Sequence, residues 1–213
     1  MRPRHPLPRK LPPTRLPNSW LFSDTRAHTD VIALAALLPP GSGVVLRHDS
    51  LASGARWRLL RRLMRLARAR GLTVLLAGTP AAAARWHAHG VHLRQHDACR
   101  AAQARRAGLL VTMPVHDAQE ARRAYRACAD GVFVSPLYPT RSHPGAPALG
   151  SAAWLRLARL AGGQAFALGG MTPARARALR RASGISVGWA AIDAWEAKAS
   201  KRRARQKRNA VPT

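Results

Sequence analysis

Residues 57–77, WRLLRRLMRLARARGLTVLLA, contain a helical segment followed by a strand, and this unit decides the fold. The leucines recur at the i, i+3, i+4, i+7 spacing with arginines between them, which predicts an amphipathic helix. Gly71 is expected to end this helix, because glycine adopts the left-handed C-terminal conformation without steric cost. The apolar run Thr73–Ala77 is short and β-rich, as expected for a strand covered on both faces.

Similar units recur about every 22 to 25 residues, so strands alternate with helices along the chain. Helix-initiating residues mark two further starts, at Asp117 with Glu120 three residues later, and at Thr172-Pro173. Eight such units predict an α/β protein whose parallel strands close into a (β/α)8 TIM barrel. An open doubly wound sheet is the alternative, but no GxGxxG follows the first strand. The expected strands are Trp20–Asp24, Val44–His48, Thr73–Ala77, Val91–Arg94, Leu109–Met113, Gly131–Ser135, Ala165–Gly169 and Ser186–Ala190.

The composition is that of a globular protein. The chain has 213 residues, of which 47% are hydrophobic, and this is enough to bury a sizeable core. No apolar run approaches the roughly 18 residues of a membrane helix, and the N-terminus is too proline-rich for a signal peptide. Cys99 and Cys128 are expected to be reduced. We therefore expect a soluble, cytoplasmic protein with no membrane partner, and its oligomeric state stays open.

The formal net charge of +27 is partly carried by the two ends of the chain. Residues 1–18 are expected to be a flexible Pro/Arg-rich arm, residues 19–197 the barrel domain, and residues 198–213 a basic tail, frayed or helical. We favour a solvated basic surface as the meaning of this charge. The alternative is attraction of phosphorylated small molecules, or of nucleic acid or an acidic partner through the tail.

In such a barrel, functional residues follow the strands at their carboxyl ends. After the sixth strand comes SPLYPTRSHPGAPALG (135–150), whose residues 140–143 offer hydroxyl and cationic donors that suit an anion. Gly169-Gly170 follows the seventh strand, where backbone N–H groups can approach a phosphate at a helix N-terminus. The alternative for both segments is structural: a rigid loop that plugs the barrel, and a tight turn.

Four segments resemble the thiamine phosphate synthase family, which includes the related thiazole tautomerases. GVHLRQHD (90–97) is similar to its Gly-Val-His-Leu-x-Gln-x-Asp, and PLYPTRSHPGAPALG (136–150) to its Pro-x-x-x-Thr-x-(Ser/Thr)-(Lys/His) loop. AFALGGM (165–171) resembles Ala-Leu-Gly-Gly-Ile, and GWAAIDA (188–194) resembles Gly-Val-Ala-x-Ile-Ser-Ala. The resemblance implies a (β/α)8 barrel that makes thiamine phosphate from hydroxymethylpyrimidine diphosphate and thiazole phosphate. It implies that diphosphate leaves first and that the thiazole nitrogen captures the pyrimidine cation.

For the diphosphate, the resemblance implies a metal ion and two cationic side chains. Asp97 would help to hold Mg²⁺, the cofactor of the family, and Arg47 would contact the diphosphate. His143 stands where many synthases have a lysine that meets this group. Arg47 and His143 are therefore the catalytic candidates.

For the thiazole phosphate, the resemblance implies binding by Thr140 and Ser142, with the backbone of Gly169 and Gly170 as a cradle. His116 ends the fifth strand and is a further candidate, for substrate binding or as a general base. A hydrogen-bonded histidine of the rim is the alternative for His116.

The chain departs from the family pattern at four places. The Gln-x-Arg-x-Lys of the second strand has become Val45, Arg47 and Asp49, and the Asn-Asp that ends the third strand, with its second magnesium ligand, has become Ala77-Gly78. Pro114 and Asp193 stand where the family has serines. These changes predict a weakened synthase, or a divergent paralogue that binds a phosphorylated heterocycle without joining it.

Other residues suggest no additional chemistry. The tautomerases place a reactive histidine after the sixth strand, where this chain has Ser135-Pro136. The histidines between 87 and 96 are expected to be scattered structural residues rather than zinc ligands. Trp189 and Trp195 are expected to pack in the core.

Overall fold

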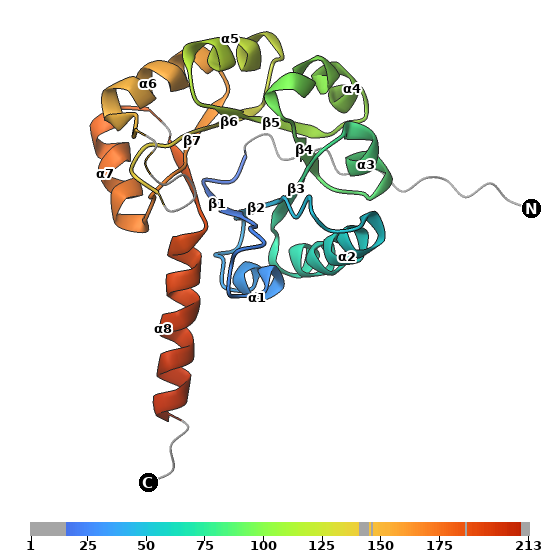
Figure 1. Cartoon of the computed structure of the whole chain (residues 1–213), viewed down its shortest axis with the longest axis vertical. Helices are drawn as coiled ribbons and strands as arrows, with labels where there is room; N and C mark the ends of the chain where they lie inside the picture. Colours follow the sequence, from blue (N-terminus) through green and yellow to red (C-terminus); the bar gives the residue numbers. More distant parts are fainter. Residues whose placement is uncertain (1–15, 141–144, 146, 186, 210–213) are drawn as a thin grey trace, which may run out of the picture.

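The computed structural model describes residues 16–140, 145, 147–185 and 187–209. Eight parallel strands form a closed barrel in which each strand pairs with its neighbours in sequence, and β8 returns to β1 through Ala190 opposite Trp20. This confirms the predicted α/β class and the (β/α)8 barrel (Figure 1). The strands are β1 (Ser19–Phe22), β2 (Gly43–Leu46), β3 (Thr73–Ala77), β4 (Gly90–His92), β5 (Leu110–Val115), β6 (Gly131–Val134), β7 (Gln164–Ala167) and β8 (Gly188–Ala191).

Helices follow the strands and surround the barrel (Figure 1). The expected start signals are present: the Asp117 side chain accepts a hydrogen bond from Glu120 N at 2.8 Å, and Thr172 Oγ1 accepts one from Arg175 N at 3.2 Å. Gly71 ends α2 in the left-handed conformation, with φ of 63°. The helices are α1 (Val31–Ala35), α2 (Ser53–Arg70), α3 (Pro80–Arg85), the 3₁₀ segment η1 (Gln95–Arg100), α4 (Ala101–Arg106), α5 (Ala118–Arg126), α6 (Gly150–Ala161), α7 (Pro173–Ser183) and α8 (Asp193–Asn209).

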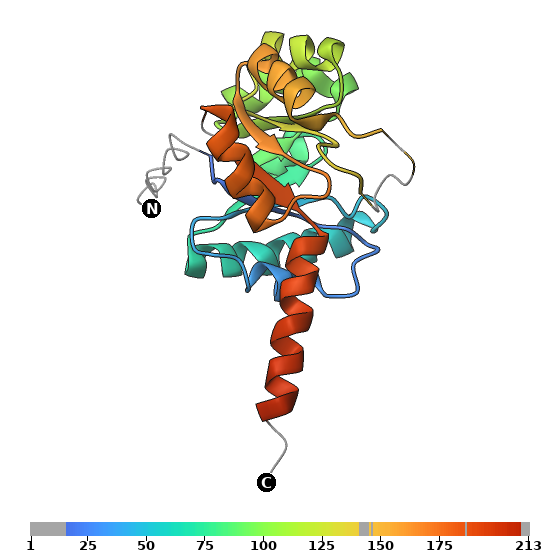
Figure 2. The same cartoon turned by 90° about the vertical axis from the view of Figure 1, so that its left-hand side faces the viewer.

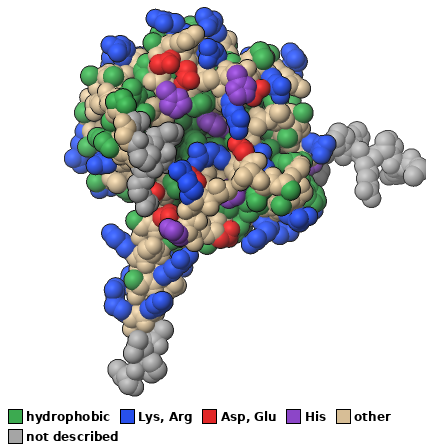
Figure 3. Space-filling view, viewed as in Figure 1, with side chains coloured by type: hydrophobic (Ala, Val, Ile, Leu, Met, Phe, Trp, Pro, Cys, Tyr) green, Lys and Arg blue, Asp and Glu red, His purple; other side chains and the backbone are tan. Residues whose placement is uncertain are grey.

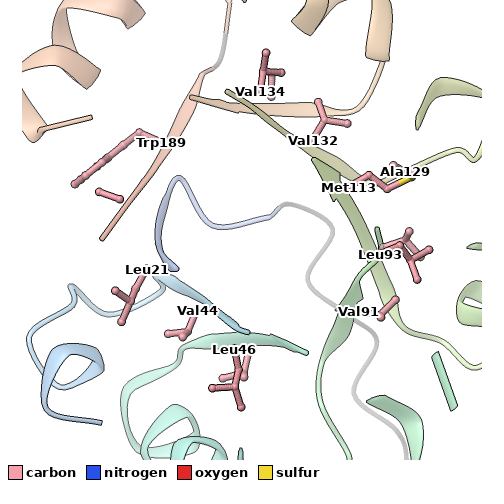
Figure 4. Packing of buried hydrophobic residues seen from close by; sticks show 14 of the residues in the cluster. Leu21, Val44, Leu46, Val91, Leu93, Met113, Ala129, Val132, Val134 and Trp189 are labelled. Carbon is pink, nitrogen blue, oxygen red and sulfur yellow. The ribbon is translucent and has the colours of Figure 1, made fainter. Parts of the chain in front are cut away.

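The core has two layers. Residues such as Val44, Leu46 and Val132 point outward from the strands and pack under the helices (Figure 4). The barrel interior is filled by a few large rings, with Trp20 edge-on to Phe133 at 5.5 Å between centroids. A Cβ atom at Gly43 would lie 2.1 Å from the Trp20 ring, so the neighbouring strand leaves room for that ring by lacking a side chain.

The two ends of the barrel domain differ. Leu16 is buried in the interior cluster, and its carbonyl accepts a hydrogen bond from Gln164 Nε2 at 3.1 Å; residues 1–15 of the expected arm lie outside the described residues. Trp195 in α8 stacks on Trp189 at 5.1 Å and donates to Trp20 O, as expected for a packing role. Residues 200–209 of α8 are all exposed, and the helix projects from the barrel in Figures 1 and 2.

Within the described segments, none of the helices has the length and apolar character needed to cross a membrane.

Candidate active site

A hollow of about 500 Å³ lies at the carboxyl ends of the strands. Figure 3 shows this face of the molecule, with basic side chains around the central depression. Five of the predicted site residues line the hollow: Arg47, His116, Thr140, Gly169 and Gly170. Much of the remaining wall is apolar, formed by Phe22, Pro136, Leu168, Met171, Ala191, Ile192, Ala194 and Ala197.

The paired glycines lie beneath the loop that follows β6. Tyr138 N donates to Gly169 O at 3.2 Å, and a Cβ atom at Gly169 would lie 2.8 Å from Pro136 Cα. At Gly170 a Cβ atom would meet Pro139 O at 2.7 Å, and φ is +91° and +60° at the two positions. Both glycines are therefore required for the close approach of this loop, and they also line the hollow.

Thr140 is the part of the predicted anion-binding segment that the structure describes, and it lines the hollow. Ser142 and His143, the other two predicted residues of this loop, lie outside the described residues. Thr172, the N-cap of α7, lines the same part of the wall. We call this side of the mouth, with Thr140, Gly169, Gly170 and Thr172, the β6–β8 half.

Arg47 follows β2, and its side chain is fixed by two acceptors and a ring. Its Nε donates to Ser23 O at 2.9 Å, its Nη2 donates to Asp24 Oδ2 at 2.9 Å, and its guanidinium lies 5.7 Å from the centre of the Phe22 ring. Burial lowers the pKa of Arg47, and the Asp24 charge opposes this shift. The hydrogen bond from Arg26 is the main reason why the pKa of Asp24 is lowered to about 2. Arg47 is thus a positioned cation in the wall.

His116 follows β5 and is held by Glu120. The Glu120 carboxylate accepts from His116 N and is also 2.8 Å from His116 Nδ1. Glu120 thus holds the Nδ1 side of the ring, and Nε2 is the other nitrogen of this histidine, which lines the hollow. A hydrogen-bonded rim histidine, one of the two expected roles, agrees with this geometry.

Asp97, the predicted magnesium ligand, lies in η1 and does not line the hollow. Its carboxylate is 3.1 Å from Arg100 Nε and 3.4 Å from His96 Nε2. Asp49, which replaces a cation of the family pattern, is likewise held between Arg56 at 2.8 Å and Arg94 at 2.9 Å. We call this side of the mouth, with Asp49, Arg56, Arg94 and Asp97, the β2–β4 half.

The carboxylates that follow β1, β2 and β4 do not fit an Mg²⁺ ion as they are arranged. Mg²⁺ takes oxygen ligands, usually including one or two carboxylates, but Asp24, Asp49 and Asp97 are each bound to arginine. Among the described residues, no group of three or more His, Cys, Asp and Glu side chains is arranged to hold a metal.

Two arginines contribute to the site without having been predicted. Arg56 Nη2 donates to the carbonyls of Ala77 and Leu46, and its Nη1 is 3.7 Å from the position of a Gly78 Cβ atom. It thus lies at the strand end where the family has Asn-Asp. Arg175 donates to Gly170 O and stacks on Tyr138 at 4.4 Å, which fixes the β6–β8 half. The sequence marked the position of Arg175 only through Thr172, the predicted helix start three residues earlier.

Asp193, one of the departures from the family pattern, begins α8 and lines the hollow. It therefore places a carboxylate in a wall where the family has a serine. A phosphate in the hollow would be repelled by this charge and attracted by the amides beside Gly169 and Gly170.

The closed barrel with a hollow at the carboxyl ends of its strands defines a protein of the (β/α)8-barrel class, whose active sites lie at this face. More specifically, the chain belongs to the thiamine monophosphate synthase family, whose family model matches residues 21–194. The family expected from the four sequence segments is thereby confirmed.

One relative by sequence supports this membership, and two solved structures share the fold. The thiamine-phosphate synthase of Geobacillus thermodenitrificans is 34% identical over 147 residues, and the match spans 67% of this chain and 66% of that protein. The thiamine phosphate pyrophosphorylase structure from Pyrococcus furiosus is 19% identical, with a TM-score of 0.70, and the match covers 90% of this chain and 96% of that one. FabK from Thermotoga maritima has a TM-score of 0.62 at 16% identity, covering 84% and 59% of the two chains, which is a similarity of fold alone.

Proposed function

We propose that the chain is a transferase that joins hydroxymethylpyrimidine diphosphate to thiazole phosphate and releases thiamine phosphate and diphosphate. The observation that carries this proposal is the convergence of Arg47, Thr140, Gly169 and Gly170 on one hollow of about 500 Å³. A hollow of this volume is within the usual range for a small-molecule site.

The β6–β8 half would bind the thiazole phosphate. Gly169 and Gly170 line the wall, where their backbone amides would meet the phosphate, and Thr140 and Thr172 add hydroxyls to the same wall. The apolar wall formed by Met171 and its neighbours would hold the thiazole ring. Ser142 and His143 remain predicted partners of the phosphates.

The bond change needs charge stabilisation more than proton transfer. The carbon–oxygen bond of the pyrimidine methylene breaks and its electron pair leaves with the diphosphate. The thiazole nitrogen then donates its lone pair to form the carbon–nitrogen bond. Arg47 would neutralise the leaving group, and its fixed position avoids reorganisation during the step.

The test is a direct product assay. Purified chain, incubated with both phosphorylated substrates in the presence and absence of Mg²⁺, is expected to yield thiamine phosphate. The same gene is expected to restore growth without thiamine in a strain that lacks the synthase. No product at high enzyme concentration, together with no growth, would reject the transferase proposal.

One observation favours a second function, that of a binding protein. The arginine-bound carboxylates of the β2–β4 half and the carboxylate of Asp193 leave a site less suited to a magnesium diphosphate. A paralogue that binds thiazole phosphate or thiamine phosphate without joining the two halves would then show saturable calorimetric binding of these compounds and no turnover.

A further inference from the structure

A second basic site lies on the outside of the barrel, between α2 and α3. The sequence between Asp49 and Asp97 contains no Asp or Glu and nine arginines. In the structure, several of them gather in a groove, and Figure 3 shows basic side chains along the edge where Figure 1 labels α2. The nine are Arg56, Arg58, Arg61, Arg62, Arg65, Arg68, Arg70, Arg85 and Arg94.

The groove consists of two adjoining hollows of about 400 and 480 Å³ that share Trp57, Arg85 and Trp86. Four arginines line the groove: Arg61, Arg65, Arg68 and Arg85. None of the described lining residues is acidic. The ion pairs found among the described residues involve other side chains. Four positive charges that share a groove repel one another. An anion bound between them would offset this repulsion and be attracted by all four.

The groove also contains two indole rings, and this distinguishes it from a surface that is only basic. Trp57 is 37% exposed in the first part of α2, and Trp86 is partly exposed directly after α3. The Arg61 guanidinium lies 5.0 Å from the centre of the Trp57 ring, so one cation is held beside an aromatic surface. An exposed tryptophan offers a flat apolar face, and the arginines offer donors for phosphate.

We infer that the α2–α3 groove binds single-stranded nucleic acid, with a base stacked on an indole ring and phosphates on the arginines. A base with a phosphate on either side is the ligand that uses both features, since stacking is tolerant of sequence and the charges follow the backbone. Two adjoining hollows provide space for more than one nucleotide. This inference is independent of the proposed synthase activity, because the groove lies on the helices and shares no lining residue with the barrel mouth.

The stacking part is tested with a fluorescein-labelled thymidine oligonucleotide of about ten nucleotides, within the site size of single-strand binders. Trp57→Leu is expected to weaken its binding, measured by anisotropy, by about five- to a hundredfold, and Trp57→Phe to retain most of the affinity. Inorganic polyphosphate, which has charge but no bases, should bind parent and Trp57→Leu equally. An unchanged oligonucleotide affinity in Trp57→Leu, or an equal loss for polyphosphate, would overturn the inference.

The charge part is tested by two pairs of substitutions on the same helix. Arg61→Gln with Arg65→Gln removes two lining cations, whereas Arg58→Gln with Arg62→Gln removes two exposed cations that do not line the groove. The lining pair is expected to lose at least five times more affinity and to reduce the salt dependence by about 1.4 in log–log slope. Equal losses from the two pairs would show a general charge effect and overturn the assignment.

The basic end of α8 is the competing site, and the full-length chain separates the two. Substitution of Lys201, Arg202, Arg205 and Arg208 by Gln is expected to leave the effect of Trp57→Leu unchanged. The oligonucleotide should also bind at least tenfold more tightly than thymidine monophosphate. The inference fails if the tail substitutions alone abolish binding, or if the mononucleotide binds as tightly as the oligonucleotide.

Discussion

The two halves of the barrel mouth have diverged to different extents. The β6–β8 half retains the Thr and Gly-Gly residues of its family, and they line an open hollow. The β2–β4 half has Asp49 and Ala77-Gly78 where the family pattern has a cation and a magnesium ligand, and its Asp49 and Asp97 are bound to arginine. Under the proposed function, this difference predicts that the β6–β8 half recognises a phosphorylated heterocycle and that guanidinium groups neutralise the diphosphate.

Removal of the Arg47 cation should have the largest effect, because Arg47 lines the hollow and is held in place by Ser23 and Asp24. Arg47→Gln is expected to lower the rate of thiamine phosphate formation by roughly a hundred- to a thousandfold. Steady-state rates at saturating substrate would measure this. A variant as fast as the parent would show that the leaving group is neutralised elsewhere.

A methyl group at Gly169 should damage the β6–β8 half and have the second largest effect. Gly169→Ala places a Cβ atom 2.8 Å from Pro136 Cα at φ of +91°, and strain of this kind costs about 1–3 kcal/mol. Urea unfolding should show this loss, and calorimetry should show weaker binding of thiazole phosphate. Gly54→Ala in α2, where the added atom has ordinary contacts, is the matched control and should be neutral or slightly stabilising. Similar behaviour of the two variants would contradict this account.

His92 is the buried last residue of β4, bonded to Thr112 Oγ1 at 3.0 Å. Burial is the main reason why its pKa is lowered to about 3, compared with about 6.5 in the unfolded chain. Between these values the unfolded state binds a proton that the folded state does not, so stability is lost as pH falls from 6.5 toward 3. His92 changes the free energy of unfolding by at most about 1.4 kcal/mol per pH unit. Burial also lowers the pKa values of His48 and His89, so both act in the same direction.

Urea unfolding at several pH values between 7 and 4 would measure this dependence. The free energy of unfolding of the parent should decrease across the range, and His92→Gln should show a smaller decrease. An equal pH dependence in parent and variant would mean that His92 becomes protonated without cost in the folded chain.

Arg94 should matter least, since it is 63% exposed and its bond to Asp49 lies at the solvent edge of the β2–β4 half. Arg94→Gln is expected to change stability by no more than about 1 kcal/mol and to leave thiazole phosphate binding unchanged. A large loss of thiazole phosphate affinity would mean that the two halves of the mouth act as one site.

The barrel was predictable because its signals are local and repeated. Each signal involves residues that are close together in the sequence. Examples are the leucine spacing in α2, Gly71 at the end of α2, and the helix starts at Asp117 and Thr172. The strand ends Gly90–His92 and Gln164–Ala167 differ from the expected bounds by only a residue or two, as is usual for element boundaries.

The site was less predictable, because its contacts join distant segments. Arg56, in the first part of α2, bonds to the carbonyl of Ala77, 21 residues away, and no sequence pattern marks such a contact. The same holds for the groove formed by Trp57 in α2 and Trp86 directly after α3. Asp97 matched the family sequence, but its pairing with Arg100 depends on the local turn of η1.

The central claim is that the β6–β8 half binds a phosphorylated thiazole without help from a metal ion. Isothermal titration calorimetry with thiazole phosphate, in buffer with EDTA and again with Mg²⁺, tests it most directly. We predict one saturable site per chain with the same affinity in both buffers, weakened in Gly169→Ala and unchanged in Arg94→Gln. Absence of binding, or binding that appears only when Mg²⁺ is added, would contradict the account.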